Sequence, residues 1–329
     1  MLKVALLSKW HVHATDYANQ LKGIEGVEIA AIWDEDKTRG AEWANDLGVD
    51  FEESLDALLA RTDIDAVVVN TPTNMHTEVI IAAANAGKHI FTEKVLTLTV
   101  KEALEIKEAI ENAKISFCIS FPHRTFSHNL FAEQVVDEKL IGEVTLLRVR
   151  NAHNGAVANW LPPHFYDAEA CGGGAMIDLG AHPMYLSRWL LGKPKNITSM
   201  FNSFTDRAVE DNAVSVIEFE NKAIAIVETG FVTSDSPFAL ELYGTEGTLL
   251  IGGPENSTKL IAKNADHQSK KWIEPETMPK QLDMPILQWV KSINGGPDAL
   301  FGIEDAVWLT ELMEGAYTSY REKRQVTFK

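Results

Sequence analysis

The chain has 329 residues, of which 45% are hydrophobic and 23% are charged, a balance typical of globular proteins with enough apolar material for two cores. Its formal net charge of −17 would repel nucleic acids and anionic lipids, so we expect neither nucleic acid nor a membrane as a partner. The sequence has no apolar run long enough to span a bilayer, and its two cysteines fit a cytoplasmic location better than a disulfide framework.

In the first part of the chain, short apolar runs alternate with amphipathic stretches. The expected strands are residues 3–7, 27–33, 65–70, 89–92 and 115–120, and the expected helices are residues 15–21, 37–47, 78–86 and 100–112. Gly87 is expected to terminate the third helix. This order predicts an α/β fold of the Rossmann type, with a doubly wound parallel sheet whose strand ends meet at one ligand-binding edge.

The second part is rich in β-type segments joined by short polar turns. A helix is expected over residues 127–138, strands over 144–152, 197–204, 213–219, 223–231, 239–243 and 248–251, and further helices over 181–191 and 303–321. The pattern predicts an α+β domain with a largely antiparallel, open sheet. We place the boundary so that the dinucleotide-binding domain covers residues 1–122 and the second domain residues 123–329.

Four motifs occur in order along these elements. Residues 71–76 read Thr-Pro-Thr-Asn-Met-His, residues 86–94 Ala-Gly-Lys-His-Ile-Phe-Thr-Glu-Lys, residues 172–182 Gly-Gly-Gly-Ala-Met-Ile-Asp-Leu-Gly-Ala-His, and residues 241–247 Glu-Leu-Tyr-Gly-Thr-Glu-Gly. Together they resemble the Gfo/Idh/MocA family of glucose–fructose oxidoreductases and inositol dehydrogenases. The resemblance implies a nicotinamide cofactor, a sugar, inositol or related polyol as substrate, and a second domain that binds substrate and assembles a homodimer or homotetramer.

Three positions depart from the family pattern. The segment from Ser8 to His13 has no glycine where the family usually has a glycine-rich turn, although a helix N-terminus there still favours phosphate. Val95 stands where proline usually follows the Glu-Lys pair, and Tyr185 where many relatives carry an acid.

Asp34 directs our expectation about the cofactor. It ends the second strand, where a carboxylate accepts both ribose hydroxyls of NAD and repels the 2′-phosphate of NADP, so NAD is favoured despite Lys37 and Arg39 nearby. Asn74 has a second possible role as the N-cap of the following helix. The position of the motifs and the resemblance give the full set of expected cofactor-binding residues: Ser8, Trp10, His11, His13, Asp34, Thr71, Pro72, Asn74, His76, Glu93 and Arg124.

Three residues are expected to carry the chemistry. Lys94 follows a strand at the ligand edge, where its ammonium group can polarise a substrate oxygen. By resemblance His182 is the acid/base, and Asp178, four residues earlier, would share one helix face with it and orient the site. The structural alternatives are a surface salt bridge for Lys94, and a helix-capping aspartate with a core histidine for the pair.

A polar and aromatic loop before the glycine run suits the hydroxyls and the apolar face of a sugar. The expected substrate-binding residues are His153, Trp160, His164, Tyr166 and Tyr185, with loop packing as the alternative for the loop residues. We assign no metal, because the His11 and His13 pair needs further ligands that the sequence does not identify. A packing or phosphate-facing role is expected for that pair instead.

The sequence therefore predicts NAD-dependent oxidation of a secondary hydroxyl on a sugar or polyol. Two alternatives stay open. One is a regulator of the same fold that binds cofactor or sugar without turnover, which the missing glycines and Val95 favour and the retained Lys94, Asp178 and His182 oppose. The other is NAD-assisted glycoside hydrolysis, in which a leaving group departs without accumulation of NADH.

Overall fold

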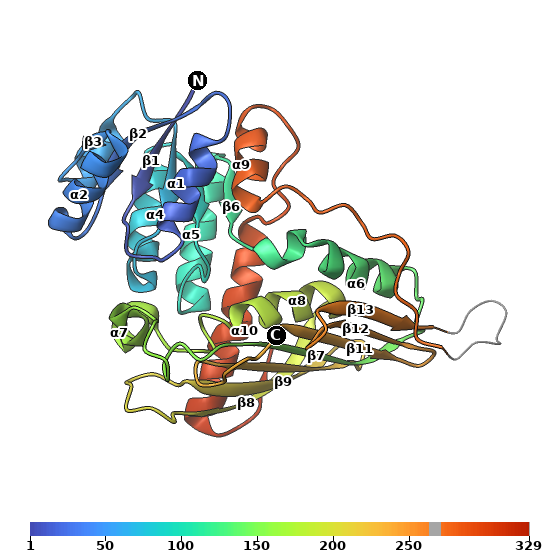
Figure 1. The fold of residues 1–329 in the computed structure, drawn as a ribbon. Helices are drawn as coiled ribbons and strands as arrows, with labels where there is room; N and C mark the ends of the chain where they lie inside the picture. Colours follow the sequence, from blue (N-terminus) through green and yellow to red (C-terminus); the bar gives the residue numbers. More distant parts are fainter. Residues whose placement is uncertain (263–270, 329) are drawn as a thin grey trace. The chain divides into compact units, whose positions relative to one another are not determined.

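The computed structural model describes residues 1–262 and 271–328 (Figure 1). It divides into two compact units, of which the first combines Met1–Phe121 with Asp283–Thr310 and the second combines Pro122–Leu282 with Glu311–Lys329. Among the helices of the described residues, none is both long and apolar enough to cross a membrane.

The first unit is built on a parallel sheet of six strands in the order β3-β2-β1-β4-β5-β6. The strands are β1 (Leu2–Leu7), β2 (Val27–Trp33), β3 (Asp50–Phe51), β4 (Ala66–Val69), β5 (His89–Thr92) and β6 (Phe117–Ile119). The order reverses between β1 and β4, and such a switch point is where doubly wound sheets bind ligands. The predicted Rossmann-type fold is confirmed.

Helices cover this sheet and explain its apolar strands. They are α1 (Ala14–Lys22), α2 (Lys37–Leu47), α3 (Leu55–Ala60), α4 (His76–Asn85) and α5 (Val100–Ala113). All four residues of β4 are buried, as expected for a parallel strand packed on both faces. Gly87 follows α4 with φ = 70°, which confirms its role in ending that helix. The capping role suggested for Asn74 is wrong, because α4 begins two residues later, after Met75, and has no side-chain cap.

The segment Asp283–Thr310 belongs to the first unit, although the sequence had placed it in the second domain. It contains α9 (Pro285–Ile293), whose Trp289 is fully buried with its ring 5.8 Å from that of Phe91 in β5. The backbone N–H of Ile119 also donates to the carbonyl oxygen of Phe301 at 2.9 Å. The segment therefore completes the core beside β5 and β6. This contact joins residues far apart in the chain, so local sequence patterns could not predict it.

The second unit holds a sheet of eight strands in the order β13-β12-β11-β7-β10-β9-β8-β14. They are β7 (Val144–Ala152), β8 (Pro194–Asn202), β9 (Asn212–Phe219), β10 (Ile224–Gly230), β11 (Ala239–Gly244), β12 (Thr248–Gly252), β13 (Ser257–Ile261) and β14 (Val326–Thr327). Among these eight strands, which lie in the described part of the chain, β7 and β10 are the one parallel pair, so the expectation of a largely antiparallel sheet is confirmed.

The helices of this unit are α6 (Ser127–Asp137), the short α7 (Ala168–Cys171), α8 (Ala181–Leu191) and the second part of α10 (Ile303–Glu322). Helix α10 belongs to the first unit up to Thr310 and to the second unit from Glu311. Helix α8 packs against β7 and β10. Short 3-10 turns lie at Thr73–Met75, Pro122–Thr125 and Pro163–Tyr166. The structure thus places the predicted chemistry of this unit at the start of α8 and in the turns before it.

Candidate active site

The chain turns at Ser8, directly after β1. Ser8 is buried with φ = 75°, a left-handed conformation that glycine adopts most readily. Its Oγ accepts hydrogen bonds from Trp10 N at 3.0 Å and from Arg39 Nη2 at 3.3 Å. A serine therefore adopts the left-handed backbone conformation that glycine usually provides, and the hydrogen bonds to its hydroxyl stabilise the turn. Helix α1 begins just after it without a side-chain cap, so the positive end of its dipole favours an anion there.

The carboxylate of Asp34, at the end of β2, is almost completely buried beside this turn. Its Oδ2 accepts from Lys9 N at 2.8 Å and from Arg39 Nε at 3.0 Å, and its Oδ1 accepts from Asp36 N at 2.8 Å and from Arg39 Nη2 at 2.6 Å. Arg39 also pairs with Glu35 at 2.5 Å. A cofactor ribose that used Asp34 would therefore have to replace the two bonds from Arg39.

Glu93, directly after β5, accepts hydrogen bonds from several neighbouring groups. Its Oε1 lies 2.7 Å from His13 Nδ1 and accepts the hydroxyl of Tyr17, whose oxygen lies 2.8 Å from Ser120 Oγ and can accept the serine hydroxyl. Its Oε2 accepts from the backbone N–H of Lys94 at 2.8 Å.

Charge and burial oppose each other at this carboxylate. Burial acts to raise the pKa of Glu93, but the positive charges of His11, His13 and Lys94 overcome this effect and hold it well below the usual value. Burial beside Glu93 raises the pKa of Tyr17, which keeps the phenol a neutral donor. Sequence reasoning missed Tyr17, since a tyrosine in an amphipathic helix looks like an ordinary core residue.

Lys94 itself is buried, and the peptide bond that joins it to Val95 is cis. Thr71, Pro72, Asn74 and His76 follow β4, as predicted. The buried ring of His76 lies within hydrogen-bond distance of the carbonyl oxygens of Thr71, Val95 and Leu96, at 3.1, 3.1 and 2.9 Å. Burial lowers its pKa, and these carbonyl groups act in the opposite direction. His76 thus ties the loop after β4 to the loop after β5, and its contact with cofactor stays a prediction.

In the second unit, His182 lies in the first turn of α8. Its Nδ1 is 2.8 Å from Tyr185 Oη, which also accepts from the backbone N–H of His123 at 3.1 Å. The rings of His123 and His182 stack, with centroids 4.3 Å apart and an interplanar angle of 21°. Tyr185, predicted as a substrate contact, therefore orients the histidine ring. His123 belongs to the same cluster and was missed, because only the fold brings residue 123 to α8.

The glycine run before α8 is held by two residues from distant segments. The carboxylate of Glu210 accepts from the N–H groups of Gly174 and Met176 at 3.0 Å and from Tyr317 Oη at 2.6 Å. A Cβ on Gly173 would lie 1.9 Å from Tyr317 Oη, and one on Gly174 would lie 2.1 Å from the Glu210 carbonyl oxygen. These glycines therefore permit the close approach of Glu210 and Tyr317, two partners that the sequence did not reveal.

Asp178 lies in the turn that this run leads into. Helix α8 begins at Ala181, so the expectation that Asp178 and His182 share one helix face is wrong. Burial lowers the pKa of His153, and the negative charge of Asp178 acts in the opposite direction.

The loop predicted to contact substrate contains both packed and exposed rings. His153 stacks on Phe231 with centroids 5.1 Å apart and lies 4.5 Å from the exposed ring of Trp160. Tyr166 is buried in an apolar cluster beneath the guanidinium group of Arg207. The carbonyl oxygen of His164 accepts from Cys171 Sγ at 3.1 Å. Packing accounts for Tyr166, whereas His153 and Trp160 keep a surface that a sugar could contact.

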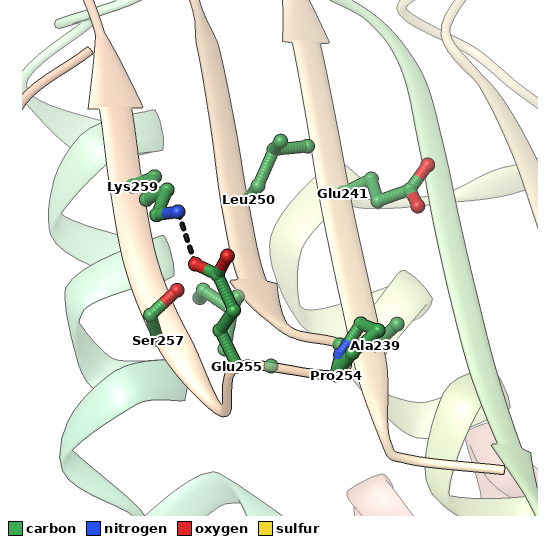
Figure 2. Close-up of a pocket in the computed structure, with 10 residues that line it drawn as sticks. Ala239, Glu241, Leu250, Pro254, Glu255, Ser257 and Lys259 are labelled. Carbon is green, nitrogen blue, oxygen red and sulfur yellow. Dashed lines mark hydrogen bonds and ion pairs between the residues drawn. The ribbon is translucent and has the colours of Figure 1, made fainter.

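Arg124, expected at the cofactor, lies over the Trp189 ring at 5.0 Å, and that indole donates to Glu133 Oε1 at 2.8 Å. A separate hollow of about 290 Å³ lies on the sheet of the second unit (Figure 2). Residues of β11 to β13 and their connections line it: Ala239, Glu241, Leu250, Ile251, Gly252, Gly253, Pro254, Glu255, Ser257 and Lys259. Glu255 and Lys259 form an ion pair there, and none of the predicted site residues lines this hollow.

Comparison with known proteins gives one consistent result. Residues 9–121 match the oxidoreductase family with an NAD-binding Rossmann fold, and residues 130–250 match the GFO/IDH/MocA C-terminal domain. Over 247 residues the chain is 30% identical to scyllo-inositol 2-dehydrogenase (NAD(+)) of Bacillus subtilis, covering 71% of this chain and 69% of the relative. It is 26% identical over 295 residues to 1,5-anhydro-D-fructose reductase of Ensifer adhaerens, covering 86% of each. The structure of levoglucosan dehydrogenase with NADH and levoglucosan has the same fold, with a TM-score of 0.85, 20% identity and coverage of 100% and 99%.

Proposed function

The chain belongs to the GFO/IDH/MocA family of NAD-binding oxidoreductases, and on that premise we propose that it oxidises a secondary hydroxyl of a sugar, inositol or related polyol. Relatives named as inositol dehydrogenases and a sugar reductase support this substrate class. The observation that carries the proposal is the orientation of His182 by Tyr185, at an Nδ1 to Oη distance of 2.8 Å.

The first unit fits a dinucleotide cofactor. Ser8 provides the left-handed turn that normally needs glycine, and the uncapped start of α1 follows it. Asp34 presents a carboxylate at the end of β2, the position that reads the ribose hydroxyls of NAD. NAD, when bound, accepts a hydride at its nicotinamide ring.

Oxidation of a carbinol also releases the hydroxyl proton, and His182 is the residue we assign to receive it. Tyr185 Oη accepts one hydrogen bond from His123 N and can accept a second from His182 Nδ1–H. In that tautomer His182 Nε2 keeps its lone pair and can take the proton. Lys94 would stabilise partial negative charge on the substrate oxygen, and Asp178 would hydrogen-bond the substrate.

The test is reduction of NAD by a panel of sugars, inositols and other polyols, followed through the absorbance of reduced nicotinamide. His182→Ala and Lys94→Met should each lower kcat by about 10²–10⁴, with NADH affinity nearly unchanged. His128→Asn in α6 is the control, because His128 lies outside the assigned set. Full activity of both variants on the true substrate would refute the assigned roles, and absence of affinity for NAD and NADP in either redox state would refute the enzyme itself.

Two further expectations concern the oligomeric state and the cellular location of the protein. The outer positions of β8, β9 and β10 expose Met200, Val214, Val216 and Ile224, an apolar surface that supports assembly into a homodimer or homotetramer. Light scattering that gives the mass of a single chain at working concentration would contradict the oligomer. The two buried free cysteines support a cytoplasmic location.

A further inference from the structure

The strongest unassigned feature is a cluster of three metal-binding residue types in the first unit. His11 and His13 lie in the turn before α1, and Glu93 follows β5, so the fold joins segments about eighty residues apart. Glu93 Oε1 is 2.7 Å from His13 Nδ1 and 3.7 Å from His11 Nδ1. The potential ligand atoms of the three residues all lie within 4.8 Å of one another.

These distances are close to those of an occupied site. Zinc binds histidine nitrogen and carboxylate oxygen at about 2.0–2.2 Å, which puts neighbouring ligand atoms roughly 3–3.5 Å apart. A separation at the 4.8 Å limit must shorten by about 1.3–1.8 Å to meet this geometry. His13 can make that adjustment, because its side chain is 43% exposed.

The charge of the cluster also calls for a cation. The side chain of Glu93 is 2% exposed, and its Oε1 faces the two imidazole rings at 2.7 and 3.7 Å. A buried charge in a folded protein is normally paired or coordinated to a metal.

The surrounding bonds prepare the ligands. His13 N lies 3.2 Å from His11 Nδ1, and a metal ion bound to that nitrogen would replace this long bond. Tyr17 donates to Glu93 Oε1 and is itself fixed by Ser120. Hydrogen bonds of this kind orient the ligands in metal sites.

We propose that His11, His13 and Glu93 form a binding site for one divalent transition-metal ion of the Zn²⁺ class, with water completing the coordination. Two imidazoles and one carboxylate suit zinc and its neighbours better than magnesium or calcium, which prefer all-oxygen sites. The exposed side of His13 gives the ion a route from solvent. The site revises the expectation that this histidine pair serves packing or phosphate, and it does not depend on the proposed dehydrogenase activity.

The test uses the full chain without a histidine tag, stripped with chelator and dialysed, in the absence of NAD. Co²⁺ is titrated while its visible absorption bands are recorded, and Zn²⁺ binding is measured by calorimetry. The wild-type chain should bind one equivalent of each ion. His13→Asn and Glu93→Gln should weaken binding at least tenfold, whereas His128→Asn should bind as the wild type does.

Circular dichroism identifies any variant that fails to fold. If Glu93→Gln fails, His13→Asn still decides the question, because its side chain is partly exposed and the substitution keeps a polar group. The proposal is overturned if the wild-type chain binds neither ion, or if His13→Asn binds them with unchanged affinity and stoichiometry. Because no cofactor is present, failure here leaves the proposed oxidoreductase activity standing, and failure of that activity leaves this site standing.

Discussion

Replacement of Asp34 by serine should reverse the cofactor preference of the first unit. Two effects act together: Asp34→Ser removes the carboxylate that accepts ribose hydroxyls, and it releases Arg39 from its two bonds of 3.0 and 2.6 Å. The guanidinium, which keeps its pair with Glu35, can then also bind the 2′-phosphate of NADP. NADH should lose affinity and NADPH should gain it.

The contacts of Asp34 set the expected size of the change. Hydrogen bonds to a charged group contribute about 1.5–3 kcal/mol each. Since the ribose hydroxyls would replace the existing bonds from Arg39, the net loss for NADH lies near the lower end, about 1.5 kcal/mol, or roughly tenfold in Kd. Loss of repulsion towards the 2′-phosphate should strengthen NADPH by at least a similar factor. The ratio of the two affinities should therefore change by roughly 100-fold.

The assay is fluorescence titration of each variant with NADH and with NADPH. Asp36→Ser is the matched control, since it removes a nearby negative charge while serine can still cap α2, where Asp36 now accepts from the N–H groups of Thr38 and Arg39. An affinity ratio in Asp34→Ser that stays within about threefold of that in Asp36→Ser would refute the reasoning.

The remaining predictions concern the second unit and the pH dependence of folding. Tyr185→Phe removes the hydroxyl that lies 2.8 Å from His182 Nδ1, so kcat should fall about tenfold and the acidic limb of the pH–rate profile should move. An unchanged profile would exclude the positioning role of Tyr185. Gly173→Ala places a Cβ 1.9 Å from Tyr317 Oη and should lower the free energy of unfolding by about 1–3 kcal/mol in urea denaturation, whereas Gly302→Ala, with open space around the added carbon, should change it much less. The pKa of His76 is lowered in the folded chain, so as the pH falls below 6.5 this imidazole takes up a proton in the unfolded chain before it does in the folded chain. The free energy of unfolding should therefore fall by up to about 1.4 kcal/mol per pH unit because of this group. His76→Asn should flatten that slope in urea titrations between pH 6.5 and pH 5, and an equally steep slope in the variant would contradict the assignment.

Local patterns predicted the elements that are long and strongly periodic. The bounds of Val27–Trp33, His89–Thr92 and Ala181–Leu191 agree with those read from the sequence, because each is a mainly apolar run between polar or glycine residues. The two-residue strands and α9 were not predicted, since they exist through contacts with distant segments. Trp289 looks like any aromatic residue until Phe91 is placed beside it.

In the candidate site too, local motifs pointed to some residues, whereas long-range contacts determine the roles of others. Motif position proposed Lys94 and His182 as candidates, and it correctly placed Asp34 directly after β2. It did not identify Glu210, Tyr317 or His123, whose roles are created by hydrogen bonds and stacking across long sequence separations. Asp178 shows the opposite error, because a helical spacing was read across a turn that ends two residues later, before α8 begins.

The absence of glycine from the first turn and the ionised state of Glu93 have one common structural basis. A glycine at position 13 would have no side chain to reach Glu93, whereas His13 approaches its carboxylate to 2.7 Å from the residue that precedes α1. Ser8 meanwhile keeps the left-handed backbone of the turn through the bond from Trp10 N. An ion held by His13 would lie beside the helix end that favours pyrophosphate and would add positive charge there. Binding of the ion and binding of a dinucleotide would then strengthen each other, because coupling between two sites on one protein is reciprocal.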